Sequence, residues 1–194
     1  MFSPPAGNAA EIIGEMQSMN TLIKTALVSL TACSLLLSVQ AWSATTEITW
    51  EKPEKYTDVR PANESRVKFR ERTFKALDEY FAKLAEKLPE KDKLAITVTN
   101  LDLAGQVWPS SFVFGNATGT DVRIVKRVDI PRIKFSYTLT NEAGKVVKSA
   151  DVDLKDMGFL DNPRTFTQNT HLGYEKAMIK EWFNEEMASA LVQN

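Results

Sequence analysis

The segment 93–105, KLAITVTNLDLAG, constrains the fold more than any other part of the chain. Its apolar residues alternate with small or hydroxylated ones, and this period of two predicts a central β-strand with one buried face. The apolar residues of its first half are Leu94, Ile96 and Val98. After Asn100 the apolar run continues in the opposite parity, at Leu101 and Leu103. Because successive side chains of a strand point to opposite faces, we expect a β-bulge or a turn near Asn100 and Asp102.

A pair of antiparallel strands is predicted in the second half of the chain. Residues 133–139 alternate between apolar and polar side chains, and residues 146–154 carry a matching apolar face. The sequence Asn141–Gly144 between them is typical of a hairpin turn. Three weaker segments also predict strands, and they are 44–50, 106–114 and 121–128. The segment 106–114 contains Pro109, which favours an irregular or edge strand.

The clearest helical pattern covers residues 64–88, where large apolar side chains recur every three or four positions and charged side chains occupy the other side. Asn63 is the predicted N-cap and Pro89 ends the helix. The apolar positions are Val67, Phe74, Leu77, Phe81, Leu84 and Leu88. A coiled-coil dimer is the alternative use of this stripe, but three heptads are short for one. A second helix with a broad apolar face is predicted over residues 174–192.

These elements together predict one two-layer α+β domain over residues 42–194. We expect a mostly antiparallel sheet of four or five strands, with both helices packed on one face. About 150 residues can bury a core without metal or disulfide support, and we expect a monomer.

The amino-terminal part of the chain predicts export. Residues 1–18 lack any periodicity, and we expect them to be an untranslated or disordered leader before a start at Met19. Residues 19–41 have the basic start, the apolar run and the small residues of a cleaved signal peptide. The mature protein would begin at Trp42 and reside in the periplasm, without a stable membrane span.

Two alternatives to a cleaved signal peptide remain open. The apolar run approaches the length of an uncleaved membrane anchor. The sequence Leu30–Cys33 resembles a bacterial lipobox, so Cys33 could instead carry a lipid and anchor a lipoprotein.

The residue types of the mature part exclude several chemistries. Residues 1–41 hold one Lys and two Glu, so residues 42–194 hold 23 basic and 23 acidic side chains. This balance gives no indication of nucleic-acid binding or of a polybasic membrane patch. Cys33 is the only cysteine and His171 the only histidine. A thiol nucleophile, a Ser-His-Asp triad and the usual zinc sites are therefore not expected, and we predict no catalytic residue, metal or cofactor.

Carboxylate and aromatic side chains are the remaining candidates for a site. Asp102 ends the central strand, and four further carboxylates could bind calcium or act as an acid/base pair. They are Asp151, Asp153, Asp156 and Asp161. Their spacing does not match a calcium loop, and an exposed strand face with turn residues explains them more simply. An aromatic platform for a sugar or peptidoglycan is a further alternative, although core packing is the better explanation for most of its members. Its members would be Trp50, Tyr56, Trp108 and Trp182.

Long loops on a rigid scaffold are where binding usually occurs. The predicted binding surface consists of residues 52–60, 106–120 and 155–172, and the candidate binding residues are Tyr56, Asp58, Asp102 and Trp108. We expect a non-enzymatic protein that binds an envelope protein or a small ligand. The alternative is a hydrolase or lyase that uses Asp102 and its neighbours on an envelope substrate. An enzyme would need at least two carboxylates that converge in a concave pocket.

Several short pieces of the sequence resemble a known family. They are Trp50–Pro53, Tyr56–Arg60, Leu101–Gly105 and Gly173–Lys176, with Trp182. Together they resemble the family of secreted bacterial proteins catalogued as domain of unknown function 3016, over roughly Thr46 to Phe183. The resemblance implies a bacterial envelope protein of about this size, and it supplies no substrate, cofactor or catalytic residue.

Overall fold

A computed structural model of the protein describes residues 44–115, 119–161 and 171–191. The predicted leader, signal peptide and Cys33 precede residue 44 and lie outside the described residues. The described elements, in chain order, are β1 (Thr45–Trp50), the 3-10 helix η2 (Pro53–Lys55), α2 (Arg66–Ala85), β2 (Lys93–Asp102), β3 (Gln106–Trp108), α3 (Ser110–Phe114), β4 (Val122–Ile124), β5 (Arg132–Thr140), β6 (Val146–Lys155), α5 (Gly173–Glu186) and α6 (Ala188–Leu191). The predicted α+β class is confirmed.

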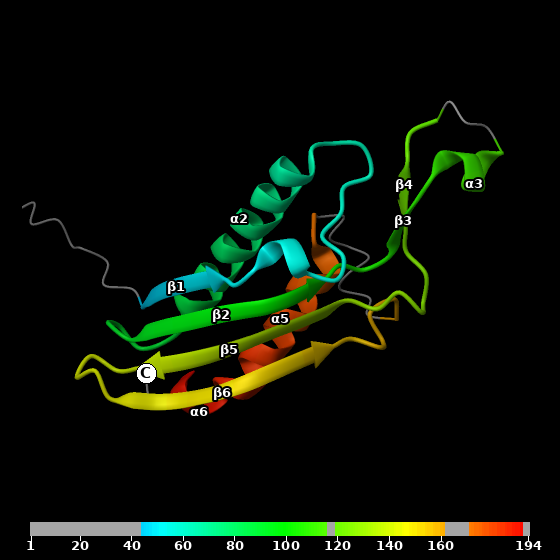
Figure 1. Ribbon diagram of the computed structural model, residues 1–194. Helices are drawn as coiled ribbons and strands as arrows, with labels where there is room; N and C mark the ends of the chain where they lie inside the picture. The colour runs from blue at the N-terminus through cyan, green and yellow to red at the C-terminus, as the bar shows by residue number, and fades with distance from the viewer. Residues whose placement is uncertain (1–43, 116–118, 162–170, 192–194) are drawn as a thin grey trace, which may run out of the picture. The chain divides into compact units, whose positions relative to one another are not determined.

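The main sheet has four strands in the order β1-β2-β5-β6 (Figure 1). Strands β2, β5 and β6 pair antiparallel, as predicted for most of the sheet, whereas β1 runs parallel to β2. Parallel neighbouring strands need a crossover connection that returns the chain to the same end of the sheet. Helix α2, between β1 and β2 in the chain, provides this connection. The sheet is therefore mixed.

The predicted break in the alternation of β2 is confirmed as a β-bulge. The pairing of β2 with β5 shifts register between Val98 and Asn100. One extra residue in the strand reverses which side chains face the core. Leu101 is consequently as inaccessible to solvent as Val98, with no exposed surface on either residue.

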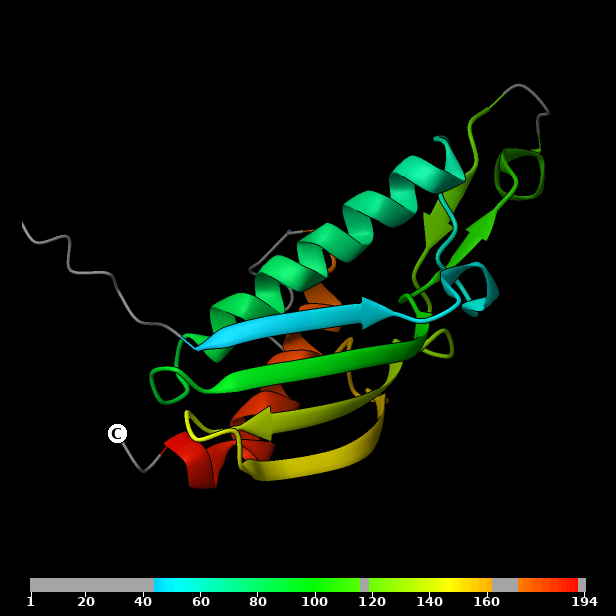
Figure 2. The same cartoon turned by 60° about the vertical axis from the view of Figure 1, so that its left-hand side comes forward.

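Both long helices contact the same face of the sheet (Figures 1 and 2). Phe81 of α2 and Trp182 of α5 each meet the ring of Phe135 on β5 edge to face, with centroid separations of 6.1 and 4.8 Å. The opposite face of the sheet carries partly or fully exposed polar residues, such as Thr97 and Asp151. The sheet and the two helices therefore form the two predicted layers.

The helix boundaries differ from the predicted ones. Helix α2 begins at Arg66 and not at Glu64, and Asn63 is not its cap. The side-chain amide of Asn63 instead donates a hydrogen bond to the carbonyl oxygen of Asp121, at 2.7 Å. The C-terminal helix is interrupted at Met187, which is fully buried between α5 and α6.

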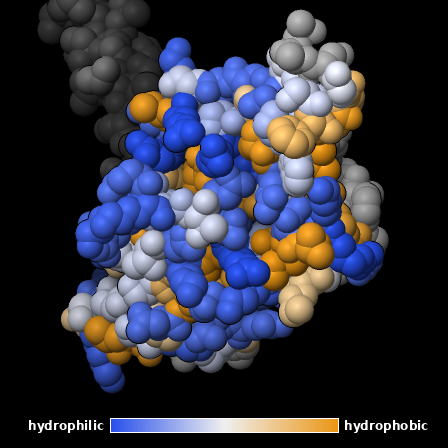
Figure 3. Space-filling model, turned by 45° about the vertical axis from the view of Figure 1, so that its right-hand side comes forward, coloured by the Kyte–Doolittle hydropathy of each residue, from blue (hydrophilic) through white to orange (hydrophobic). Residues whose placement is uncertain are grey.

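A two-stranded arm extends from the end of the main sheet. Strands β3 and β4 pair antiparallel in a separate sheet, and α3 lies between them in the chain (Figures 1 and 2). The predicted strand 106–114 is therefore wrong beyond Trp108, where Pro109 ends the ladder and a short helix begins. The predicted strand 121–128 is limited to three residues. Figure 3 shows exposed hydrophobic surface on this arm, which includes Phe112, with 79% of its surface exposed.

None of the helices within the described ranges combines the length and the hydropathy that a membrane crossing requires.

Candidate functional site

The segment that leads from η2 towards α2 lies beside the end of β2. The backbone N–H of Asp58 donates to the carbonyl of Leu101 at 3.4 Å, and the N–H of Leu103 donates to the carbonyl of Asp58 at 3.2 Å. These bonds form an isolated parallel bridge between Asp58 and Asp102. The bridge places two predicted site residues, Asp58 and Asp102, side by side at one end of the sheet.

The segment that enters β5 closes the other side of this region. The N–H of Gly105 donates to the carbonyl of Asp129 at 3.0 Å. A hollow of about 450 Å³ lies where the three segments meet, and small-molecule sites commonly have volumes in this range. The hollow is lined by Thr57, Asp58, Arg60, Asp102, Leu103, Gly105, Gln106, Val107, Val128, Asp129, Ile130 and Arg132.

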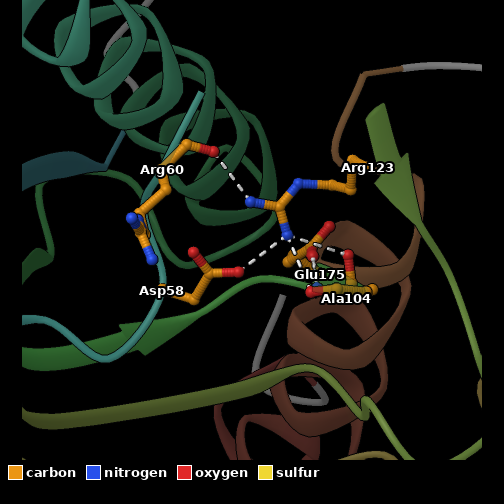
Figure 4. A network of polar contacts seen from close by, with 6 residues as sticks. Asp58, Arg60, Ala104, Arg123 and Glu175 are labelled. Atoms are coloured by element: carbon orange, nitrogen blue, oxygen red, sulfur yellow. Dashed lines mark hydrogen bonds and ion pairs between the residues drawn. The ribbon is translucent and has the colours of Figure 1, made fainter. Parts of the chain in front are cut away.

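The side chain of Arg123 on β4 connects these segments to one another by hydrogen bonds (Figure 4). Its Nη1 donates to Oδ2 of Asp58 at 2.9 Å and to the carbonyl of Gly105 at 2.8 Å. Its Nη2 donates to the carbonyl of Arg60 at 2.8 Å. The side chains of Arg123 and Asp58 are only 22% and 14% exposed, so water screens this ion pair weakly. The planar fork of donors lets one guanidinium fix several backbone groups at once.

Glu175 connects the same network to the first turn of α5. The residue is 3% exposed, and its Oε1 accepts a hydrogen bond from the N–H of Ala104 at 2.8 Å (Figure 4). Burial raises the pKa of Glu175, because a charged carboxylate loses its hydration, while the bond from Ala104 acts in the opposite direction. The turn after β2 is thus held from one side by Arg123 and from the other by Glu175.

The tight turn at Gly105 brings β2 against the base of the arm. Gly105 has φ +80°, and a Cβ atom there would lie 2.6 Å from the carbonyl oxygen of Ile124. A side chain would therefore be strained both by the backbone conformation and by the contact.

Gly105→Ala is expected to lower the free energy of unfolding by about 2–3 kcal/mol, by left-handed strain and a backbone clash. Gly144→Ala is the matched control, since Gly144 has φ +74° with nothing within 4 Å of the added Cβ. The control should lose only about 1 kcal/mol in the same urea titration. Equal losses at the two glycines would show that the close approach to Ile124 has no energetic consequence.

Two of the four candidate binding residues line the hollow, and two do not. Asp58 and Asp102 line it. Burial raises the pKa of Asp102 and the negative charge of Asp58 raises it further, while the positive charges of Arg132 and Arg123 act in the opposite direction. Tyr56 is 9% exposed and donates its hydroxyl to the carbonyl of Val98 at 2.8 Å, and burial raises its pKa to about 12. Trp108 stands on the arm, where the ammonium of Lys126 lies 4.1 Å from its ring centre.

The remaining aromatic candidates belong to the core. Trp50 stacks on Phe74 with ring centres 4.0 Å apart and donates its indole N–H to Asp78 at 2.9 Å. Trp182 packs against the rings of Phe135 and Tyr137. Core packing, the simpler explanation of these tryptophans, therefore accounts for both.

Three of the four other candidate carboxylates have structural partners, and the fourth, Asp151, is an exposed residue of β6. Asp153 pairs with Lys134 and Lys155, and Asp161 pairs with Arg127. Asp156 accepts a hydrogen bond from the N–H of Gly158 in a turn. Among the described residues, no group of three or more His, Cys, Asp or Glu side chains is arranged to hold a metal ion.

Neither cation of the site was among the predicted binding residues, although Arg60 falls within the predicted binding surface 52–60. Arg60 and Arg132 line the hollow with exposed side chains, and neither guanidinium forms a hydrogen bond or ion pair with another described residue. Figure 4 shows that the backbone carbonyl of Arg60 faces Arg123, whereas the side chain of Arg60 extends away from Arg123. Arg60 lies within the piece Tyr56–Arg60 that carries the family resemblance, and this signal could have pointed to it.

Comparison with known families supports the resemblance. Residues 44–185 match the family described as "Protein of unknown function (DUF3016)". Neither a curated protein nor a solved structure matches the chain significantly. Three of the pieces that carry the resemblance meet in the network around Arg123, through Asp58, Ala104 and Glu175.

Proposed function

We propose that this chain, which belongs to the DUF3016 family of proteins of unknown function, is a bacterial envelope protein that binds a small polar ligand without chemical conversion. The ligand site is the hollow at the end of the sheet, and its anchors are the guanidinium groups of Arg60 and Arg132. The periplasm is the proposed compartment, on the strength of the predicted signal peptide over residues 19–41. Anchoring through a lipid on Cys33 is the alternative.

One observation carries the binding proposal: two arginines without partners among the described residues line a hollow whose walls are otherwise fixed. The backbone bonds around Asp58 and Gly105, together with the contacts of Arg123, hold those walls in place. A rigid wall reduces the entropy that a ligand must overcome when it binds. Guanidinium groups recognise carboxylates and phosphates by paired hydrogen bonds. An anionic group is therefore the part of a ligand that this hollow is best suited to hold.

A second candidate function is carboxylate-dependent hydrolysis or elimination. Asp58 and Asp102 both line the hollow, so the condition that an enzyme needs two carboxylates in one concave site is met. The raised pKa of Asp102 beside Asp58 would suit a general acid. Asp58, however, is committed to Arg123, which stabilises its negative charge as part of the scaffold. The binding function requires no further role for Asp58, and we favour it for this reason.

Native mass spectrometry of the purified protein, after incubation with the small-molecule fraction of a bacterial envelope extract, tests the binding function. A bound small-molecule mass is expected on the wild type, and Arg132→Ala should reduce its occupancy about tenfold, which corresponds to about 1.4 kcal/mol. Arg66→Ala is the matched control, because Arg66 is exposed at the start of α2 and does not line the hollow. The control should retain the bound mass.

Unchanged occupancy in a folded Arg60→Ala/Arg132→Ala variant would contradict the binding site. The same samples distinguish the second candidate function. Conversion of the bound compound by the wild type, but not by a folded Asp102→Asn variant, would establish the enzyme in place of the binding protein.

A further inference from the structure

The hollow contains groups of opposite charge that face each other across two strands without forming a direct ion pair. Asp102 and Arg132 are direct cross-strand partners in the pairing of β2 with β5. Opposed residues of antiparallel strands have Cβ atoms about 4.5–5.5 Å apart, close enough for an ion pair. The side chains of Asp102 and Arg132 form no ion pair with each other, and both residues line the hollow. Both side chains therefore keep hydrogen-bonding positions that a third group could occupy.

Two carboxylate oxygens at the same place lack a donor. Oδ2 of Asp129 and Oδ1 of Asp58 are buried atoms that accept no hydrogen bond from any described residue. Asp58 is already paired through its other oxygen with Arg123, whereas Asp129 forms no ion pair within the described part of the chain. A carboxylate without a donor is unfavourable in a partly buried place, and Asp129 lines the hollow, so an ammonium group bound there would supply the missing counter-charge.

We propose that the ligand of this hollow is a zwitterion, with its anionic group on Arg60 and Arg132 and its ammonium group on the carboxylates of Asp102 and Asp129. Free amino acids and short peptides with both ends free are the chemical class that carries these two charges within a small volume. This inference rests on the binding function proposed above and specifies its ligand.

The balance of charges explains why a ligand of one sign would fit poorly. Asp58 is paired with Arg123. The remaining charged residues of the hollow are two cations, Arg60 and Arg132, and two carboxylates, Asp102 and Asp129. An anion would satisfy the arginines but would leave Asp102 and Asp129 partly desolvated without a counter-charge, and a cation would do the reverse. Discrimination between ligands arises from such unsatisfied groups as much as from the hydrogen bonds that a ligand forms.

Isothermal titration calorimetry with three related probes tests the inference. Alanyl-alanine carries both charges, N-acetyl-alanyl-alanine carries only the negative one, and alanyl-alanine amide carries only the positive one. The wild type is expected to bind alanyl-alanine at least about tenfold more tightly than either capped probe, a difference of about 1.4 kcal/mol.

Two variants assign the two charges to their partners. Arg132→Ala should remove the preference for alanyl-alanine over its amide, and Asp129→Asn should remove the preference over the N-acetylated probe. Arg66→Ala should preserve both preferences, since it lies outside the hollow.

The outcomes separate this inference from the function on which it rests. Equal binding of alanyl-alanine and N-acetyl-alanyl-alanine would overturn the zwitterion and leave an anion-binding protein. Failure of all three probes, in a protein that still captures a mass from envelope extract, would overturn this ligand class alone. Absence of any captured mass would instead overturn the binding function.

Discussion

Arg123→Ala is expected to lower the free energy of unfolding by about 3–4 kcal/mol. Removing the guanidinium leaves the largely buried carboxylate of Asp58 without its counter-charge, and breaking a buried pair in this way typically costs about 3–5 kcal/mol. The lower part of that range applies because both side chains retain some exposure. The carbonyls of Arg60 and Gly105 lose their donors as well. Urea titration followed by circular dichroism measures the change.

Two further variants show whether the geometry of Arg123 matters or only its charge. Arg123→Lys keeps a positive charge near Asp58, but a single ammonium cannot reproduce the planar fork that reaches two segments, so we expect it to recover only about half of the loss. Arg66→Ala, at an exposed site on α2, should change stability by less than about 0.5 kcal/mol. If Arg123→Ala were no more destabilising than Arg66→Ala, the network would not hold the site together.

Phe81→Ala is expected to cost about 3–5 kcal/mol, because it opens a cavity where both helices meet the sheet. The ring is completely buried, and it contacts Phe135 of β5 and Trp182 of α5 with centroid separations of 6.1 and 6.5 Å. Since the ring lies among side chains of three elements, those side chains can close the cavity only in part. Chemical denaturation measures the loss.

Lys83→Ala provides the control on the same helix. Lys83 lies two residues further along α2 with an exposed side chain, and its removal should change stability by less than about 0.5 kcal/mol. A small effect at Phe81 similar to that at Lys83 would mean that α2 does not pack on the sheet through this ring.

The parts of the fold that depend on local pattern were predictable from the sequence. The alternation around Leu94 and its reversal after Asn100 indicate both the strand and its bulge, because side-chain direction in a strand depends only on residue count. The hairpin between β5 and β6 follows from matching alternation on both sides of a turn. Helix α2 follows from its apolar stripe, although its first residue does not, since Asn63 bonds to a distant carbonyl in place of capping the helix.

The arm shows where local pattern is ambiguous. The short run Ser110–Phe114 has too few residues for periodicity to separate a strand from a helix, and in the structure it forms α3. Pro109 correctly indicated an interruption of the strand, but it did not indicate a helix after the interruption. The parallel pairing of β1 was likewise not readable from its six residues, because it depends on how α2 crosses the sheet.

The site was only half predictable for a related reason. Asp102 was identifiable as a carboxylate at a strand end, and Asp58 came with the family resemblance. Arg132 becomes the neighbour of Asp102 only through the register between β2 and β5, which the bulge shifts. Arg123 reaches the site from a different sheet, 65 residues along the chain from its partner Asp58. Such long-range placements leave no signal in the spacing of residues.

Two-dimensional NMR of the isotope-labelled protein, during titration with the small-molecule fraction of envelope extract, tests most directly whether the hollow is the binding site. The amide resonances of residues 57–60, 102–107 and 128–132 are expected to shift together and to saturate, while those of β6 stay unchanged. The same titration of the Arg60→Ala/Arg132→Ala variant should leave the three segments unperturbed. Saturable shifts confined to other parts of the chain, or identical shifts in the variant, would contradict the account.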